Sequence, residues 1–232
     1  MATTNSPSFR FKQFAIADSR CGMKLGTDGV LAGALARLGE GARLIADIGA
    51  GCGIIALMLA QRFEGATIDA VELDGGAFED LKANIEASPW KGRVTPIMGD
   101  FAQLLGPYDL IVSNPPYFLT GETAPDASRA AARHAGSLSA ASLVDFAAER
   151  LTPGGMLSMI IPSESAAQIE EKAVFCRMAL QRRVDIATSA RRGVSRTFLE
   201  FSNDLSVVPR VEKLYLNSDE YRSLTREFYL YD

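Results

Sequence analysis

The sequence predicts an α/β fold built on a mainly parallel sheet. Short apolar runs recur along the 232 residues with helical stretches between them, and this alternation is typical of parallel sheets. A glycine-rich loop follows one of these runs, at residues 49–53, and polar residues end the runs that come after it. Together these observations predict a nucleotide-binding domain of the strand, glycine loop, helix type.

Each element follows from a local pattern. The expected parallel strands are residues 44–48, 67–71, 94–98, 110–112 and 156–161, and the expected helices are 54–62, 140–151 and 163–178. Apolar residues recur in the last two helices at spacings of three and four, as one buried face requires. Residues 184–186 and 197–201 alternate in polarity, which predicts antiparallel strands at the edge of the sheet.

The glycine loop is the first candidate binding element. Gly49, Gly51 and Gly53 follow Asp47 and an apolar run, and they precede a predicted helix. Glycine lets the backbone turn tightly and lie against a ligand, while the N–H groups that begin the helix can bind a carboxylate or a phosphate. The third glycine comes one residue earlier than in the dinucleotide-binding fingerprint, so that fingerprint is absent.

Two acids end the next apolar runs. Glu72 comes about 20 residues after the glycine loop, where a carboxylate can hold both hydroxyls of a ribose. Asp100, which precedes Phe101, can accept a hydrogen bond from an adenine amino group. The alternative for both acids is a solvated strand end.

Residues 114–117 read Asn-Pro-Pro-Tyr and carry the most specific chemistry. The lone pair of a planar NH2 group is delocalised, so this nitrogen attacks weakly unless acceptors hold its hydrogens. The oxygens of Asn114 and Pro115 can be those acceptors, Pro116 stiffens the chain, and Tyr117 can stack on a flat substrate. The alternative is an ordinary turn, which such dipeptides often form.

These motifs, in this order, resemble the class I S-adenosylmethionine-dependent methyltransferases. The resemblance implies a Rossmann-like, mainly parallel sheet of seven strands with an antiparallel edge and helices on both faces. It implies S-adenosylmethionine as cofactor and methylation of an amino or amide nitrogen. The implied cofactor residues are Asp47, Gly49, Gly51, Gly53, Glu72, Leu73, Asp100, Phe101 and Asn114.

The N-terminal part resembles one subfamily in particular. Residues 9–14 and 21–29 look like those of the bacterial tRNA1(Val) (adenine(37)-N6)-methyltransferases, whose substrate is adenine 37 of a tRNA. The resemblance implies that Thr27 and Asp28 lie beside the methionine end of the cofactor, and that Lys24 and Gly26 also bind the cofactor. Cys52 departs from the small hydroxyl residue that is common in relatives, and its size fits. Two alternatives stay open: a glutamine methyltransferase that acts on release factors, and an inactive cofactor-binding module.

Charge offers a weaker indication of an RNA partner. The net charge is −4, whereas many nucleic-acid-binding proteins are basic overall. Arginine clusters can still bind phosphates locally. The candidate RNA-binding residues are Arg129, Arg133, Arg182, Arg183, Arg191, Arg192 and Arg196, and the alternative is that they are solvated surface charges.

The organisation expected is one methyltransferase domain over residues 1–232, a monomer or weak dimer. Residues 1–40 are expected to form a hairpin and a cofactor-covering segment, 41–205 the Rossmann-like core, and 206–232 a C-terminal extension. We expect neither a leader nor a membrane segment, and therefore a cytoplasmic location. Three cysteines without a C-x-x-C pair and a single histidine argue against disulfides and against a metal site.

Overall fold

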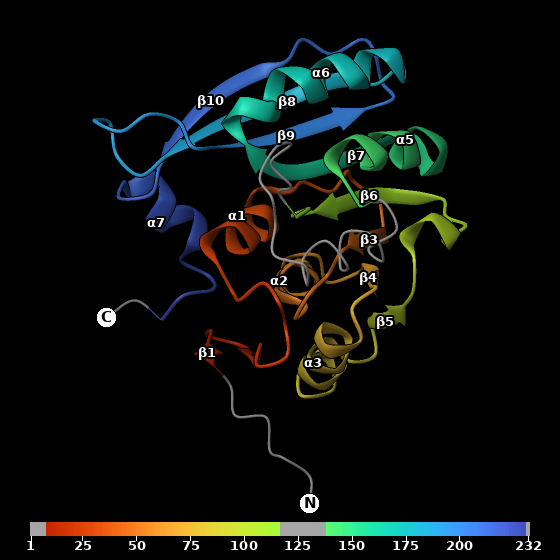
Figure 1. Cartoon of the computed structure of the whole chain (residues 1–232), viewed down its shortest axis with the longest axis vertical. Coiled ribbons are helices and arrows are strands. Elements are labelled where there is room, and N and C mark those ends of the chain that lie inside the picture. The colour runs from red at the N-terminus through yellow and green to blue at the C-terminus, as the bar shows by residue number, and fades with distance from the viewer. Residues whose placement is uncertain (1–7, 117–137, 231–232) are drawn as a thin grey trace, which may run out of the picture.

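The computed structural model describes residues 8–116 and 138–230, and a central sheet runs through it with helices on both faces (Figure 1). The strands of this sheet are β3 (Leu44–Ile48), β4 (Thr67–Glu72), β5 (Val94–Met98), β6 (Tyr108–Ser113), β7 (Leu151–Pro162), β8 (Ala179–Ala187), β9 (Arg196–Ser202) and β10 (Arg210–Tyr215). Their order is β10-β8-β9-β7-β6-β3-β4-β5. The predicted mixed fold with a mainly parallel sheet is therefore confirmed.

The helices divide between the two faces of the sheet. The α-helices are α1 (Thr27–Leu35), α2 (Ile54–Arg62), α3 (Gly75–Glu86), α5 (Ala140–Arg150), α6 (Ala166–Phe175) and α7 (Asp219–Thr225), and the short 3₁₀ turns are η1 (Phe101–Gln103) and η2 (Ser163–Ser165). Ile45 and Leu110 are paired across β3 and β6 and pack with α1, α2 and α3. Their neighbours Ala46 and Ile111 pack on the opposite face with α5 and α6. Because both faces are covered, the central strands are mainly apolar, and Asp47 and Ser113 are buried polar exceptions.

Short polar residues start the helices that flank the site. Asp74 caps α3 by accepting a hydrogen bond from the amide of Ala77 over 2.8 Å. Ser139 and Ser142 form a capping box at the start of α5. The N-cap of α2 is Gly53 at φ +88°, a left-handed conformation that glycine adopts without the steric cost of a Cβ.

Two expectations about the sheet edge were wrong. The described part of the sheet has eight strands, because β10 from the expected C-terminal extension pairs in parallel with β8. Among these eight, β9 alone is antiparallel, and it lies between β7 and β8. Alternating polarity is a sign of one-sided burial and carries no information on strand direction. Strand β10 was missed because four of its six residues are exposed, so it lacks the apolar run that predicted the other strands.

The two ends of the described chain meet beside α1. The predicted N-terminal hairpin is present as β1 (Phe9–Arg10) and β2 (Ala15–Ile16). The amide of Lys12 donates to the carbonyl of Phe228 over 2.8 Å, and the rings of Phe11 and Tyr229 stack with centroids 5.7 Å apart. These contacts fix the hairpin, and with it the start of the segment that follows, residues 17–26.

Candidate active site

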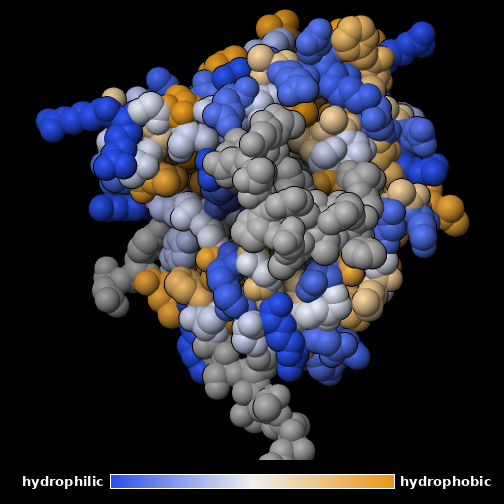
Figure 2. All heavy atoms as spheres, viewed as in Figure 1, coloured by the Kyte–Doolittle hydropathy of each residue, from blue (hydrophilic) through white to orange (hydrophobic). Residues whose placement is uncertain are grey.

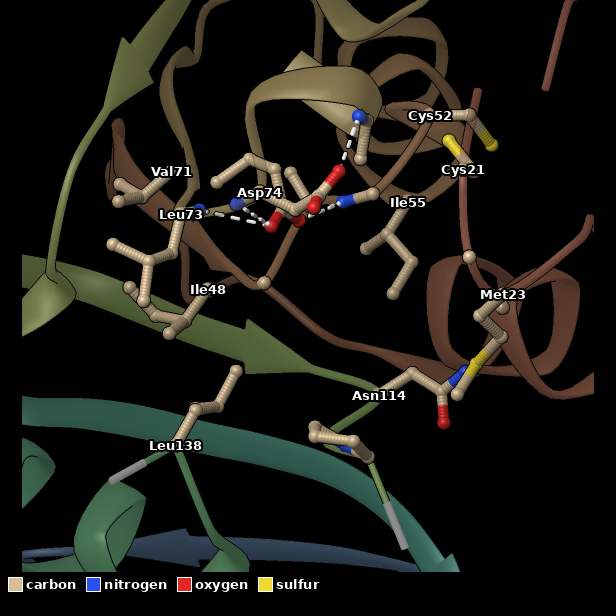
Figure 3. A pocket seen from close by; sticks show the side chains of 18 of the residues that line it. Cys21, Met23, Ile48, Cys52, Ile55, Val71, Leu73, Asp74, Asn114 and Leu138 are labelled. Atoms are coloured by element: carbon tan, nitrogen blue, oxygen red, sulfur yellow. Dashed lines mark hydrogen bonds between the residues drawn. The ribbon is translucent and has the colours of Figure 1, made fainter. Parts of the chain in front are cut away.

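A cavity of about 780 Å³ opens at the carboxyl edge of the parallel strands (Figure 3). Its walls come from the loops after β3, β4, β5 and β6 and from the covering segment, which we define as residues 17–26. The predicted site residues that line it are Lys24, Gly26, Gly49, Gly51, Glu72, Leu73, Asp100, Phe101, Asn114 and Pro116. Segments far apart in the sequence therefore meet in one site, as expected for an open α/β sheet.

Five predicted residues do not line this cavity. They are Thr27, Asp28, Asp47, Gly53 and Pro115. Thr27 and Asp28 begin α1, where the Asp28 carboxylate pairs with the guanidinium of Arg196, Oδ2 to Nε 2.8 Å. Pro115 is buried behind the lining residues on either side of it. Tyr117 lies outside the described residues.

The three loop glycines differ in what surrounds them. All three have positive φ, at +69°, +56° and +88° for Gly49, Gly51 and Gly53. A Cβ on Gly49 would lie 2.6 Å from Leu138 and one on Gly53 2.7 Å from Leu81, whereas one on Gly51 would meet no atom within 4 Å. Gly49 and Gly53 therefore allow neighbouring side chains to pack closely, whereas the backbone of Gly51 faces open space in the cavity.

Glu72 ties the glycine loop to the end of β4. Its Oε2 accepts from the amide of Gly51 over 2.7 Å, and its Oε1 accepts from the amides of Leu73 and Asp74, both over 2.8 Å. An ionised carboxylate offers about four acceptor positions. Three of them are used by the protein, so little acceptor capacity remains for the pair of ribose hydroxyls expected from the sequence.

Asp47 is fully buried beneath the loop. Its Oδ2 accepts from the amide of Ala56 in the first turn of α2 over 2.9 Å, while Oδ1 has no hydrogen-bond partner among the described residues. Burial raises the pKa of Asp47 to about 7, with a smaller contribution from the negative charge of Glu72. Asp47 thus holds the start of α2 from below and does not face the cavity.

Asp100 and Phe101 form the wall after β5. Asp100 caps η1, with Oδ1 2.9 Å from the amide nitrogen of Ala102. Phe101 is only 6% exposed, and its ring packs edge-on against Phe146, with centroids 5.3 Å apart. Asp100 therefore supplies the polar atoms of this wall, and Phe101 mainly anchors it.

Asn114 sits at the point where β6 ends. Ser113, the last residue of the strand, is buried and donates its hydroxyl to the carbonyl of Ile48 over 2.7 Å, which joins the ends of β6 and β3. The half-buried Asn114 then enters the cavity wall opposite the glycine loop, with Met23 of the covering segment on the same side (Figure 3). An amide is thus held at the mouth by an anchored strand end.

The covering segment is a closed loop organised by Asp18. The amide of Leu25 donates to Oδ2 of Asp18 over 2.8 Å, and the ammonium of Lys24 donates to the carbonyls of Asp18 and Ser19 over 2.6 and 3.2 Å. The Lys24 ammonium is therefore bound to carbonyls of its own segment. Its side chain lines the cavity, but the charge is directed to these carbonyls and not into the cavity.

Sequence reasoning missed most of the apolar lining. The additional residues include Cys21, Met23, Leu25, Ile48, Ala50, Cys52, Ile54, Ile55, Val71, Ala77 and Leu138. Several end buried strands or begin helices, so their pattern is that of core residues. The one indication in the sequence was the resemblance of residues 21–29 to one subfamily, which implied that this segment lies at the cofactor site.

Three of the predicted RNA-binding arginines form ion pairs with acids of this chain, and of the three Arg182 alone is buried. Arg182 is 8% exposed and pairs with the buried Glu200 and with Glu212, at 3.4 and 3.5 Å. Arg183 pairs with Glu170 and Asp185 at 2.8 and 2.9 Å. Arg196 pairs with Asp28. The sequence showed the cluster of cations, but the acids that neutralise it come from distant elements.

Arg191 and Arg192 are exposed, in the loop between β8 and β9. The carboxyl end of β8 points to the same edge of the sheet as the cavity, because β8 runs parallel to β6 and β7. On the face shown in Figure 2, hydrophilic and apolar side chains are intermingled over the described surface. Arg129 and Arg133 lie outside the described residues.

No metal centre is found in the described ranges, where no three His, Cys, Asp or Glu side chains come close enough to share an ion. Nor does any helix of those ranges have the length and apolar character needed to cross a membrane.

Sequence comparisons point to one family. Residues 25–184 match the family model of the methyltransferase small domain. A protein of Tolumonas auensis named tRNA1(Val) (adenine(37)-N6)-methyltransferase is 42% identical over 232 residues, which cover 96% of this chain and 97% of that protein. A protein of the same name from Bacteroides thetaiotaomicron is 38% identical over 97% of this chain and 98% of its own.

Solved structures agree with the fold. A protein of Agrobacterium tumefaciens described as a predicted O-methyltransferase superposes with a TM-score of 0.69 at 18% identity, over 88% of this chain and 98% of its own. At that identity the likeness concerns the fold alone.

Proposed function

Since the chain belongs to the tRNA1(Val) (adenine(37)-N6)-methyltransferase family, we propose that it transfers a methyl group from S-adenosylmethionine to N6 of adenine 37 in tRNA1(Val). The observation that carries the proposal is the position of Asn114 at the end of β6, in the wall of the same cavity as the glycine loop and Glu72. A cofactor site and a group that can orient an amine thus adjoin.

The cavity fits S-adenosylmethionine in size and chemistry. Its volume lies within the range of about 300 to 1,000 Å³ typical of small-molecule sites. The open space at Gly51 lets a ligand lie against the loop, and the N–H groups at the start of α2 suit the methionine carboxylate. The remaining acceptor capacity of Glu72 suits a ribose hydroxyl, and Asp100 suits the adenine amino group.

When bound, S-adenosylmethionine supplies an electrophilic methyl group on its sulfonium sulfur. The side-chain oxygen of Asn114 and the carbonyl of Pro115 would accept the hydrogens of the target amine and turn its lone pair toward that methyl group. Pro116 stiffens the strand end, so the acceptors stay in place. The amine would gain the methyl group as the bond from that group to sulfur breaks, which leaves S-adenosylhomocysteine, and the amine would then release a proton to water. No covalent bond to the enzyme is required.

The target base must leave its stack in the anticodon loop before it can reach Asn114, which costs a few kcal/mol. By the resemblance, Tyr117 would cover the extruded base. Arg191 and Arg192 are the described candidates for contact with the RNA backbone, since both are exposed at the edge that carries the cavity. A tRNA substrate also agrees with a cytoplasmic location.

The test is methyl transfer from labelled S-adenosylmethionine to total tRNA from a strain that lacks the gene, followed by nucleoside analysis. We expect label in N6-methyladenosine. Label in a release factor and none in tRNA would favour the glutamine methyltransferase, and tight cofactor binding without transfer to any of these acceptors would favour an inactive module.

A further inference from the structure

Asn84 lies outside the cavity and joins two of its walls. It is on α3 and only 5% exposed. Its side-chain oxygen accepts from the amide of Ala17 over 2.9 Å, and its side-chain nitrogen donates to the carbonyls of Ala17 and Cys52 over 2.7 and 2.8 Å. One side chain thus bonds the start of the covering segment and the middle of the glycine loop together.

The bonds of Asn84 match the donors and acceptors of an asparagine amide. Such an amide has one oxygen and two N–H donors, and here the oxygen and both donors have backbone partners. Replacement by an apolar residue would leave three buried backbone groups without this partner, and each such group costs free energy comparable to its desolvation. No residue without both a donor and an acceptor can reproduce the arrangement.

Asp80, one turn earlier on α3, strengthens the same attachment. It is buried and accepts from the amide of Arg20 over 2.6 Å, and its other oxygen lies 3.6 Å from the Arg20 guanidinium. Residues four apart on a helix share one face. This face of α3 therefore holds the covering segment at Ala17 and Arg20, just before the segment enters the cavity wall at Cys21.

The two walls meet directly above this attachment. Cys21 of the covering segment and Cys52 of the glycine loop are both buried and both line the cavity, with their side chains adjacent (Figure 3). The two thiols hydrogen-bond to each other, but within the described ranges no backbone hydrogen bond runs from Cys21 to Cys52. Asn84 supplies that link through the Cys52 carbonyl, so the spacing of the walls depends on it.

We propose that Asn84 is a positioning residue for cofactor binding, which sets the distance between the covering segment and the glycine loop. The proposal rests on S-adenosylmethionine being the ligand of the cavity and is independent of the RNA substrate. Without Asn84 the walls separate, and the cofactor has to restore their spacing when it binds. Cofactor affinity then falls, while the saturated enzyme keeps its rate.

The test compares Asn84→Ala with Ser88→Ala. Ser88 is a matched control because it is buried just past α3. Its hydroxyl donates to the carbonyl of Ile85 over 2.8 Å and accepts from the amide of Trp90 over 3.2 Å, and neither partner belongs to the two walls. Binding of S-adenosylhomocysteine is measured by calorimetry, and KM and kcat are measured separately for cofactor and tRNA. We expect Asn84→Ala to raise the Kd and the cofactor KM about tenfold, while kcat and the KM for tRNA stay unchanged.

Ser88→Ala should lower the thermal midpoint without changing the cofactor Kd. Equal changes in Kd for both variants, or an unchanged Kd in Asn84→Ala, would overturn the proposal. If Asn84→Ala does not fold, Asn84→Ser retains one donor and should give an intermediate Kd, and a wild-type Kd in that variant would also overturn it. A wild-type protein that fails to bind S-adenosylhomocysteine would refute the proposed cofactor instead.

Discussion

The amide of Gly51 donates to the Oε2 atom of Glu72 over 2.7 Å, so the residue at the end of β4 closes the loop that follows β3. Glu72 also accepts from the amides of Leu73 and Asp74. The carboxylate thus shapes two loops of the cavity before any ligand arrives. We therefore expect Glu72 to act in binding both directly and through the backbone that it holds.

Glu72→Ala should weaken S-adenosylhomocysteine binding at least tenfold, because the variant loses an acceptor for the ribose together with three backbone hydrogen bonds. Glu79→Gln, an exposed change on α3, is the control and should leave the Kd unchanged. Calorimetry on both variants checks this. Wild-type affinity in Glu72→Ala would show that the carboxylate neither holds the loop nor meets the cofactor.

Gly51→Ala and Gly53→Ala should differ in their main effect: the first should impair cofactor binding, and the second should lower thermal stability. Both force a side chain into a left-handed backbone, at roughly 1–2 kcal/mol. At position 53 the new Cβ also meets Leu81, and overpacking adds roughly 1–3 kcal/mol, so this variant should have the lower thermal midpoint. At position 51 the Cβ enters open cavity and should chiefly abolish cofactor binding. Equal midpoints in thermal denaturation would contradict this division.

Asp47 should make the free energy of unfolding depend on pH. Its pKa is about 7 when folded and about 4 when unfolded, so the folded protein keeps a proton that the unfolded chain releases. Stability relative to Asp47→Asn should therefore fall as pH rises from 5 to 7 and then level off, by a total on the order of 3 kcal/mol. Urea denaturation from pH 5 to 8 measures it, and parallel curves for the two proteins would refute it.

Much of the fold and of the site follows from patterns along the chain. Residues 54–62 form the predicted helix, because Gly53 marks its start and an unbroken apolar run, Ile54 to Ala60, follows. Gly51, Glu72 and Asn114 meet at one edge because parallel strands place their carboxyl ends together. β10 was missed because most of its residues are exposed, and Asn84 because a buried asparagine on a helix has no signature in sequence.

The arginines show where sequence reasoning fails. Local spacing suggested a basic surface, but Glu200 and Glu212 reach Arg182 from neighbouring strands, and Asp28 reaches Arg196 across 168 positions of sequence. Ion pairs depend on side chains brought together by the sheet. Counting the charged residues in a short stretch of sequence cannot detect such ion pairs. The spacing of apolar residues that predicts a strand, in contrast, lies within one short stretch.

Arg182 and the pair Arg191 and Arg192 should therefore respond differently to mutation. Arg182→Met should destabilise the fold by about 2 kcal/mol, since the buried Glu200 loses one of its two arginine partners and keeps the ion pair with Arg37. The double change Arg191→Ala with Arg192→Ala should leave the thermal midpoint unchanged and raise the KM for tRNA. It should also reduce the slope of log affinity against log salt by up to about 2. An unchanged salt slope would remove these arginines from the RNA interface.

Asn114 is the residue that we propose to orient an adenine amine of tRNA. The most direct measurement is N6-methyladenosine at position 37 of a tRNA1(Val) transcript after incubation with wild type or Asn114→Ala, with S-adenosylhomocysteine binding measured in parallel. We predict that the wild type forms the modified base, and that the variant binds the cofactor analogue with near wild-type affinity but forms none. Methylation by Asn114→Ala at near wild-type rates, or no methylation at that adenine by the wild type, would contradict the account.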